Sequence, residues 1–567
     1  MSSAMQTECD LAVIGSGVAG LTAALAASAS GLHVIVVEAD ALIGGATALS
    51  EGMIWAPNSK AARALPEAPG EAEEASSALA YLKATAGGDF DADRARAYIE
   101  AAPQVLTFLD TASGLTFTLN RSSRDYYPDA PGATLGRRAL NPDPFDAREL
   151  DRSLFARIRP PLKTMMIWGG MSIASRDLTD FLQAGRNPGA ALRVATLFAR
   201  HTWDRLTGWP RGARLGNGNA IIARLAAAVT RAGVEIRTDW PADRLRILDG
   251  SVKVVSGQHG EITARKGVVL ASGGLNAHPT ERKTYIGATP HLAIPASSPV
   301  ASLAELVDGT GAVIESNISQ PVLWAPGSIV PSGAGRPGPW PHFGDRAKPG
   351  VICVGPDGKR FANEAMMYHD FVPAMVTATR GHPEGPHCWL LCDHYAIRRY
   401  GLGPIGPFPV RLKSYLDAGY LRKGFTLADL AVEIGVPTGQ LEETVTRFNA
   451  FALQGSDPDF GRGSNSYDLV NGDPLHRPNA SLGPLKTTPF YAIRLIPADI
   501  GAFIGIRVDQ HSRAISKYGE PIPGLWAAGN AAAPLTSGSY PAAGLTIGAA
   551  AVFGWLAARN ALAGGKL

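Results

Sequence analysis

The chain has 567 residues, with 53 basic and 50 acidic side chains and a formal net charge of +3 at pH 7. This balance gives no electrostatic sign of nucleic-acid binding, and the length allows several domains with large cores. The four cysteines are Cys9, Cys353, Cys388 and Cys392. They are too few and too scattered for a disulfide framework or a metal site, so we expect a cytoplasmic protein without a metal.

No segment resembles a secretion signal, and the most apolar late run, 549–558, is too short to cross a bilayer. A helix expected at 190–205 mixes arginines with Leu, Val, Phe and Trp side chains. Such a pattern fits an ordinary amphipathic helix over a core. It also fits a peripheral contact with the inner face of the membrane, and this alternative stays open.

Residues 10–52 are the stretch around which the chain is organised. Residues 11–14 and 34–37 are short apolar runs that predict buried parallel strands, and an Ala-rich helix is expected at 21–30 between them. The turn before this helix consists of Gly15, Ser16, Gly17, Val18, Ala19 and Gly20. Strand, glycine turn, helix, strand and the closing Glu38 form the dinucleotide-binding pattern, in which the helix N-terminus binds phosphate. Glu38 should accept hydrogen bonds from the ribose, with Ala39 beside it.

The segment after the second strand indicates which dinucleotide the chain binds. It resembles the GG-x-[ST]-x₂-S-x-G segment of the fumarate reductase and 3-ketosteroid dehydrogenase flavoproteins. The matching positions are Gly44, Gly45, Ala46, Thr47, Ser50, Glu51 and Gly52. The resemblance implies that these residues bind FAD. No histidine stands where related chains attach flavin covalently, so we expect non-covalent FAD.

Further FAD contacts are expected where the chain returns to the nucleotide-binding sheet. After a helix at 221–232, strands at 244–248 and 252–256 should form a small antiparallel layer. Ala242 is included among the expected cofactor contacts. Ala271, Ser272 and Gly273 resemble the A-[ST]-GG motif of flavoproteins with two dinucleotide domains, where small residues let the strand end pass close to FAD.

A loop with two adjacent tyrosines, at 124–132, resembles the PDY-x-PE-x-PGG loop of the 3-ketosteroid dehydrogenases. From composition alone, the tyrosines could be packing residues. The resemblance implies that Tyr126 enters the active site, with Tyr127 as an alternative. A second segment, 358–368, resembles the G-KRF-x-NE segment of fumarate reductase-like caps, followed by the tyrosine of the ketosteroid dehydrogenases, here Tyr368.

Two C-terminal segments, 521–530 and 539–548, resemble the flavin-contacting GLYAAGN and YPGPG-x-TIG segments of the same family. Two turn positions of the second motif have become alanines, but Tyr540 and Gly544 keep their spacing. The implied FAD contacts are Gly529, Asn530, Leu545, Thr546 and Ile547. The last helix should direct its N-terminal N–H groups at the flavin pyrimidine edge.

The fold expected is α/β: a Rossmann-type FAD-binding domain, similar to glutathione reductase, with an inserted α+β cap that carries catalytic residues. We expect the FAD-binding domain at 1–316 (with a helical insertion at about 140–205) and 488–567, and the cap at 317–487. The resemblance implies a 3-ketosteroid 1-dehydrogenase, whose flavin is reoxidised by an external electron acceptor. Tyr368 would take the C2 proton, Tyr126 would support it, and Tyr540 with the Gly544 N–H would hold the C3 carbonyl.

Three alternatives remain. A 3-ketosteroid 4-(5α)-dehydrogenase would use similar parts in a shifted geometry. A fumarate reductase-like enzyme would reduce an activated alkene, but residues 500–505 are apolar where that group has a histidine, which favours an uncharged substrate. A flavin-binding protein without catalysis is the third, and the set of three tyrosines argues against it.

Overall fold

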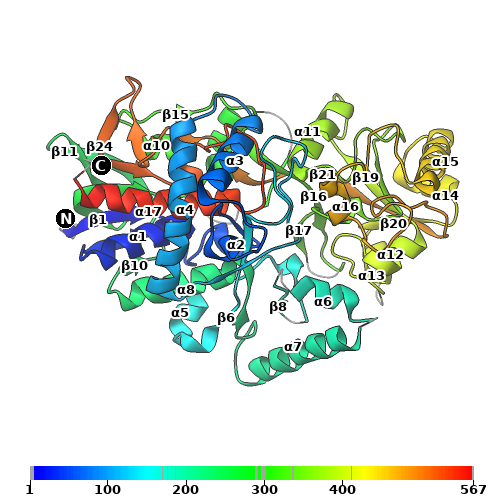
Figure 1. Cartoon of the computed structure of the whole chain (residues 1–567), viewed down its shortest axis with the longest axis horizontal. Helices are drawn as coiled ribbons and strands as arrows, with labels where there is room; N and C mark the ends of the chain where they lie inside the picture. The colour runs from blue at the N-terminus through cyan, green and yellow to red at the C-terminus, as the bar shows by residue number, and fades with distance from the viewer. Residues whose placement is uncertain are drawn as a thin grey trace.

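The structure is a computed structural model that describes residues 6–168, 170–174, 177–185, 187–287, 291–294, 302–334, 337–409 and 412–564. Two bodies lie side by side in Figure 1. The body on the left contains both ends of the chain and the nucleotide-binding sheet, and the body on the right is a cap built from the middle of the chain. The expected division into two bodies can therefore be followed in the figure.

The nucleotide-binding sheet is built from parallel strands with buried Val, Ile and Leu side chains. Its parallel strands, in spatial order, are β10 (Glu235–Arg237), β2 (Val34–Val37), β1 (Gln6–Ile14), β13 (Gly260–Leu270) and β24 (Pro521–Ala527). The antiparallel strands β11 (Ala242–Leu248) and β12 (Ser251–Gly257) extend β13, and β23 (Arg513–Ile515) pairs with β24. The predicted first strands and the small antiparallel layer are confirmed. A run of buried Val, Ile and Leu is what a parallel sheet covered on both faces requires.

Helices cover this sheet and supply the phosphate-binding end. They are α1 (Val18–Ala29), α3 (Glu71–Ala84), α4 (Ala92–Ser113), α8 (Asn217–Arg231) and α17 (Leu545–Leu562). The helices α1 and α17 pack so closely that a Cβ on Gly554 would lie 2.3 Å from the Ala19 carbonyl oxygen. Within the described residues, α17 alone is long and apolar enough to cross a membrane, and 67% of it is buried inside the protein.

The cap is built on a seven-stranded sheet. Its strands are β17 (Gly338–Pro341), β16 (Val322–Val330), β21 (Phe490–Ala502), β19 (Cys388–Cys392) and β18 (Val351–Val354), with β14 (Leu292–Ala293) and β20 (Leu421–Gly424) also paired to β21. Its helices are α11 (Tyr368–Ala378), α12 (His394–Tyr400), α13 (Leu412–Asp417), α14 (Leu427–Ile434), α15 (Thr438–Gln454) and α16 (Ser466–Asn471). The helix α11 packs on β16 and begins at the tyrosine expected to act as base.

The limits of the cap differ from those expected from the sequence. The expected cap ends at residue 487, yet β21 continues the cap sheet to Ala502 by pairing with β16 and β19. The short β14 also joins this sheet, 25 residues before the expected start at 317. The apolar sequence of β21 predicts a buried strand but carries no mark of the sheet that it joins, because pairing is decided by tertiary contacts.

The remaining elements are short connections and the insertion. They are β3 (Ile54–Trp55), β4 (Phe117–Leu119), β5 (Ala139–Pro142), β6 (Phe145–Asp146), β7 (Met166–Ile167), β8 (Met171–Ser172), β9 (Arg214–Leu215), β15 (Ile314–Glu315), β22 (Gly505–Ile506), α2 (Lys60–Arg63), α5 (Arg152–Arg157), α6 (Leu178–Gln183), α7 (Pro188–Leu206), α9 (Pro279–Glu281) and α10 (Leu303–Val307). The helix predicted at 190–205 is α7, which lies at the lower edge of the molecule in Figure 1.

Candidate active site

Three tyrosines from distant parts of the chain meet where the cap touches the nucleotide-binding part. Tyr126 comes from the loop between β4 and β5, Tyr368 is the first residue of α11, and Tyr540 precedes α17. The phenol oxygens of Tyr126 and Tyr368 are 3.4 Å apart, and the ring centroids of the three tyrosines are separated by 5.6–6.1 Å. The structure thus brings together the three tyrosines that the sequence singled out.

The Tyr126 loop is held against the Tyr540 loop by backbone contacts. The Tyr126 N–H donates to the Pro541 carbonyl at 2.8 Å, and the buried Tyr81 hydroxyl donates to the same oxygen at 2.6 Å. The Tyr127 N–H donates to the Tyr81 hydroxyl at 3.2 Å. Tyr127 itself points elsewhere, since its hydroxyl donates to Asp370 at 2.9 Å. Of the two adjacent tyrosines, Tyr126 is therefore the one beside Tyr368.

The pair expected to hold a carbonyl oxygen is already assembled. The Gly544 N–H and the Tyr540 oxygen are 3.3 Å apart and hydrogen-bonded. Gly544 caps α17 with a left-handed φ of +86°, and a Cβ there would lie 2.5 Å from the Met53 carbonyl carbon. Only glycine fits this position, because it tolerates the dihedral angle and leaves room for the neighbouring chain. A carbonyl oxygen placed between the two groups could accept both hydrogen bonds.

Burial controls the protonation of the three phenols. It raises the pKa of Tyr126, Tyr368 and Tyr540, and the neighbouring tyrosines raise those of Tyr126 and Tyr368 further. A tyrosine that acts as a base must ionise well below its ordinary pKa, and the protein alone has the opposite effect. The reason is physical: desolvation penalises a phenolate more than nearby hydrogen-bond donors stabilise it.

Two aromatic residues of the site were missed by the sequence analysis. The Tyr467 ring on α16 lies 5.2 Å from the Tyr126 ring, and the Phe343 ring lies 4.7 Å from the Tyr368 ring, measured between centroids. Together they enclose the Tyr126–Tyr368 pair in an apolar wall. Neither residue belongs to a recognisable motif, and only tertiary packing places them here.

The glycine turn at the start of α1 has the close packing that a dinucleotide site requires. A Cβ on Gly20 would lie 1.9 Å from the Gly15 carbonyl oxygen, and one on Gly15 would lie 2.2 Å from the Ala271 carbonyl oxygen. The Val18 N–H, at the helix start, donates to the Thr47 hydroxyl at 3.2 Å. These positions fit a pyrophosphate at the N-terminus of α1.

Glu38 ends β2 with its carboxylate already in use. It accepts hydrogen bonds from the Ser16 N–H at 3.0 Å, the Ser16 hydroxyl at 2.5 Å and the Asp40 N–H at 3.0 Å. A carboxylate has about four acceptor sites, so capacity remains for a ribose hydroxyl. Ala242 begins β11 close by, where the Trp240 N–H donates to the Glu38 carbonyl at 2.9 Å.

Residues at the start of α8 contact the segment 44–52. The Asn219 side chain donates to the Ala48 carbonyl at 2.6 Å, and the Gly44 N–H donates to the Ser16 hydroxyl at 2.9 Å. Gly218 lies so close to this segment that a Cβ there would be 1.8 Å from the Thr47 carbonyl oxygen. Asn219 and Gly218 are supporting residues that the sequence analysis did not assign.

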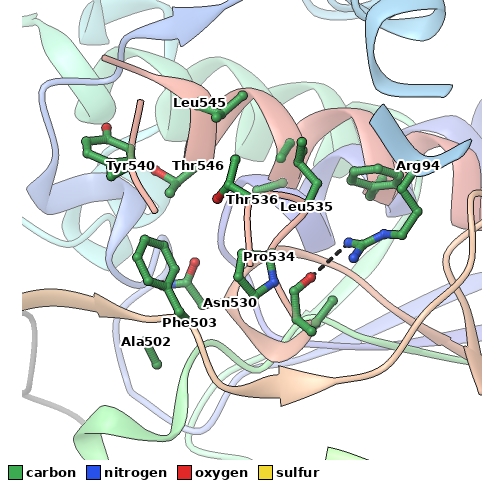
Figure 2. Close-up of a pocket in the computed structure, with 16 residues that line it drawn as sticks. Arg94, Ala502, Phe503, Asn530, Pro534, Leu535, Thr536, Tyr540, Leu545 and Thr546 are labelled. Carbon is green, nitrogen blue, oxygen red and sulfur yellow. Dashed lines mark hydrogen bonds between the residues drawn. The ribbon is translucent and has the colours of Figure 1, made fainter. Parts of the chain in front are cut away.

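Figure 2 shows the cavity in front of α17, which has an empty volume of about 510 Å³. It is lined by four of the expected cofactor residues, Gly529, Asn530, Leu545 and Thr546, together with Tyr540 and Phe503. Ile547, also expected to contact the cofactor, is not among the residues that line this cavity. The cavity joins the expected cofactor positions to one of the three tyrosines.

Glu51 differs from its neighbours, because residues 52–59 are buried and its side chain is exposed. Surrounding protein nevertheless desolvates this carboxyl and raises its pKa, as for a group that faces an internal cavity. Its charge is also one of the smaller influences that raise the pKa of Tyr126 and Tyr540.

Comparison with known proteins agrees with this geometry. The model of the FAD binding domain family matches residues 10–547. A 3-oxosteroid 1-dehydrogenase of Mycolicibacterium smegmatis is 34% identical, over 97% of this chain and 96% of its own. A 4-oxocyclohex-2-ene-1-carboxylate 5-dehydrogenase of Sinomonas cyclohexanicum is 36% identical, over 97% of this chain and 93% of its own.

A solved structure shows the same arrangement over the whole chain. The 3-ketosteroid Δ1-dehydrogenase from Sterolibacterium denitrificans, in complex with 1,4-androstadiene-3,17-dione, superposes with a TM-score of 0.88 and 30% identity. The match covers 98% of this chain and all of that chain. The flavoprotein fold expected from the sequence is confirmed.

Tyr540→Phe should slow oxidation of a ring ketone about 10²-fold, because one carbonyl donor contributes about 3 kcal/mol to the barrier. The measurement is the anaerobic rate at which the substrate reduces the bound flavin. Tyr400→Phe, which removes a tyrosine hydroxyl that donates to Asp473 in the cap and leaves the Tyr540–Gly544 pair untouched, is the control. Unchanged flavin reduction in Tyr540→Phe would remove this residue from the site.

Proposed function

Since the chain belongs to the FAD binding domain family of flavoprotein oxidoreductases, we propose that it removes one hydrogen each from C1 and C2 of a 3-ketosteroid A ring. The observation that carries this proposal is the meeting of Tyr126, Tyr368 and Tyr540 in one buried cluster. A ring ketone makes the neighbouring C–H acidic, and a base, an oxyanion holder and a hydride acceptor complete the reaction.

Tyr368 is the proposed base. Tyr368 acts as the phenolate, formed by loss of its own proton before the reaction: the C2–H bond breaks, the proton goes to the Tyr368 oxygen to give the neutral phenol, and the electron pair is delocalised onto the C3 carbonyl oxygen. As the C1–C2 double bond forms, hydride leaves C1, so the steroid loses two electrons and two hydrogens in all. When bound, FAD supplies the hydride acceptor, and an external electron acceptor must then remove these electrons.

The remaining residues stabilise the charges that develop. Tyr126 is placed to donate a hydrogen bond to the Tyr368 oxygen once that oxygen is a phenolate, which offsets part of the desolvation penalty. The Tyr540 hydroxyl and the Gly544 N–H are placed to donate to the C3 oxygen as it becomes an enolate. Gly544 also begins α17, whose N-terminus favours negative charge.

The residues proposed to hold FAD non-covalently come from the turn before α1, the end of β2 and the segment after it, the start of β11, the end of β13 and the segments around the start of α17. They are Gly15, Gly17, Val18, Ala19, Gly20, Glu38, Ala39, Gly44, Gly45, Ala46, Thr47, Ser50, Glu51, Gly52, Ala242, Ala271, Ser272, Gly273, Gly529, Asn530, Leu545, Thr546 and Ile547. The close glycine packing at the N-terminus of α1 supports the assignment of the phosphate end.

The Sinomonas relative raises a smaller, anionic substrate as a second candidate, a cyclohexenone carboxylate. The Glu51 carboxyl disfavours this anionic substrate. Glu51 has no hydrogen-bond or ion-pair partner among the described residues, and its charge is close enough to Tyr126 and Tyr540 to raise the pKa of both. A second carboxylate near this charge costs free energy by repulsion, so a neutral steroid is the better substrate.

The first test mixes the anaerobic FAD-loaded enzyme with androst-4-ene-3,17-dione. We expect bleaching of the flavin and a 1,4-diene product. A saturated 5α-3-ketosteroid that alone bleaches the flavin and yields a 4-ene would replace the proposal by 4-(5α)-dehydrogenation. No bleaching by either steroid would contradict both, and fumarate and polar enones would then be tested with the reduced enzyme.

The same assay with 4-oxocyclohex-2-ene-1-carboxylate and its methyl ester tests the role of charge. The wild type should prefer the ester. Glu51→Gln should improve the carboxylate relative to the ester about tenfold, since it removes one nearby negative charge at similar size. Glu51→Asp, which keeps the charge, is the matched control. A ratio that is the same in all three proteins would contradict this assignment of Glu51.

We also propose a cytoplasmic protein that contacts the inner face of the membrane through α7. Leu192, Trp203 and Leu206 are 62–77% exposed and lie within about 60° of one another on a helix with 100° per residue. Exposed Trp and Leu on one helix face fit the lipid interface, where steroids dissolve. Two of the arginines on α7 pair with acids, Arg193 with Asp180 and Arg200 with Asp146, which weakens its attraction to anionic lipid.

Sedimentation with phosphatidylcholine–phosphatidylglycerol vesicles tests this contact. Serine at Leu192, Trp203 and Leu206 together should abolish most of the vesicle-bound fraction, because the buried apolar area supplies the binding. Serine at Val432, Leu453 and Leu475, which are 67–76% exposed on the cap, should leave it unchanged. A wild-type protein that stays in the supernatant would contradict the contact.

A further inference from the structure

Three consecutive residues at the start of α11 each contact the nucleotide-binding part. Tyr368 meets Tyr126, with phenol oxygens 3.4 Å apart. The His369 Nε2 lies 3.1 Å from the Gly538 carbonyl oxygen, in the loop that leads to Tyr540. Asp370 accepts a hydrogen bond from the Tyr127 hydroxyl at 2.9 Å. The two residues that follow the proposed base therefore each make a hydrogen bond that joins the cap to the nucleotide-binding part.

In these contacts, two neighbouring residues of the loop bind two residues that lie close together on α11. Tyr126 and Tyr127 are adjacent in the loop, and Tyr368 and Asp370 lie on the first turn of the helix. The loop is fixed in turn to the Tyr540 segment, through the Tyr126 N–H and the Pro541 carbonyl at 2.8 Å. A shift of α11 that breaks the Tyr127–Asp370 bond would thus move the Tyr368 phenol away from Tyr126.

The Tyr126–Tyr368 contact has little tolerance for such a shift. Its 3.4 Å separation is already longer than the 2.5–3.0 Å usual for O–H···O hydrogen bonds, so a small further displacement removes it. In contrast, the Tyr127–Asp370 bond is short enough to fix the two elements. Burial and the neighbouring Asp370 charge raise the pKa of Tyr127, so the phenol keeps the proton that it donates.

We propose that the hydrogen bond between Tyr127 and Asp370 is a latch that sets the distance between Tyr126 and Tyr368, which makes Tyr127 and Asp370 positioning residues for the base. Tyr127 acts through the loop and Asp370 through the helix, and neither donates to the substrate. As a consequence, the Tyr126–Tyr368 pair, which contains the proposed proton acceptor, forms when the cap docks on the nucleotide-binding part. The inference rests on the proposed role of Tyr368.

The chain offers a matched control for the latch. The Tyr400 hydroxyl donates to Asp473 at 2.9 Å, so it makes the same type of bond at the same length. Tyr400 ends α12 and Asp473 follows α16, so both residues belong to the cap. Tyr400→Phe therefore removes a Tyr–Asp hydrogen bond without loosening the cap from the nucleotide-binding part.

The kinetic test uses the FAD-loaded full-length enzyme and androst-4-ene-3,17-dione. Tyr127→Phe and Asp370→Ala should each slow flavin reduction roughly 10²-fold, the scale of a misplaced reacting group. Steroid Kd should change less than about threefold, and deuterium at C2 should slow the variants more than the wild type. Asp370→Asn, which keeps an acceptor oxygen, should recover most of the rate, and the double variant should be no slower than either single one.

A spectroscopic test does not require turnover. We would place 3-fluorotyrosine at position 368 and record its ¹⁹F resonance in the FAD-loaded protein. Tyr127→Phe and Asp370→Ala should shift or broaden this resonance, and Tyr400→Phe should not. If no steroid reduces the wild-type flavin, the proposed function fails, while a shifted resonance would still support the latch.

Three results would overturn the latch. One is an unmoved ¹⁹F resonance in both latch variants, which would show that Tyr368 keeps its place without the bond. A second is an equal loss of rate in Tyr400→Phe, which would reveal a general effect on stability. Additive losses in the double variant would also contradict a single shared bond, because residues that act through one interaction are not additive.

Discussion

The phenol oxygens of Tyr126 and Tyr368 lie 3.4 Å apart although 242 residues separate them in the chain. One belongs to a loop of the nucleotide-binding part and the other begins a cap helix, so their contact exists only while the two bodies are docked. The Tyr127–Asp370 and His369–Gly538 hydrogen bonds flank it. The proposed catalysis by a tyrosine base depends on this docking, because an isolated buried phenol holds its proton.

The site is built almost entirely from aromatic and backbone groups. Tyr467 and Phe343 close the wall around the tyrosines, and Gly544 offers a backbone N–H beside Tyr540. The Glu51 charge raises the pKa of both Tyr126 and Tyr540. An apolar enclosure with one negative group suits a large neutral ring ketone better than a small anion, and this links the structure to the choice of substrate.

Local patterns predicted the parts of the fold that local physics determines. Apolar runs and the need for close packing predicted the strands at 11–14 and 34–37, the glycine turn and the helix α1. The structure confirms these elements. The antiparallel pair β11–β12 was predictable for the same reason. The end of the cap could not be predicted from the sequence, because the apolar strand β21 could have joined either the cap sheet or the nucleotide-binding sheet.

The site was predictable only in part. Its three tyrosines were identified through resemblance to known families, and no spacing rule brings residues 126, 368 and 540 together. Tyr467, Phe343 and Asn219 carried no motif and needed the structure. The raised pKa of Tyr368 was also missed, because desolvation is a property of the packed protein and leaves no mark in the sequence.

The central claim is that Tyr368 removes the proton, and it is tested most directly with Tyr368→Phe. The FAD-loaded variant would be mixed anaerobically with androst-4-ene-3,17-dione while flavin absorbance is recorded. We predict that the steroid still binds, seen as a shift of the flavin spectrum, but that bleaching slows by at least about 10³-fold, within the range that general base catalysis supplies. Bleaching at the wild-type rate would contradict the account, because another group would then have to accept the proton.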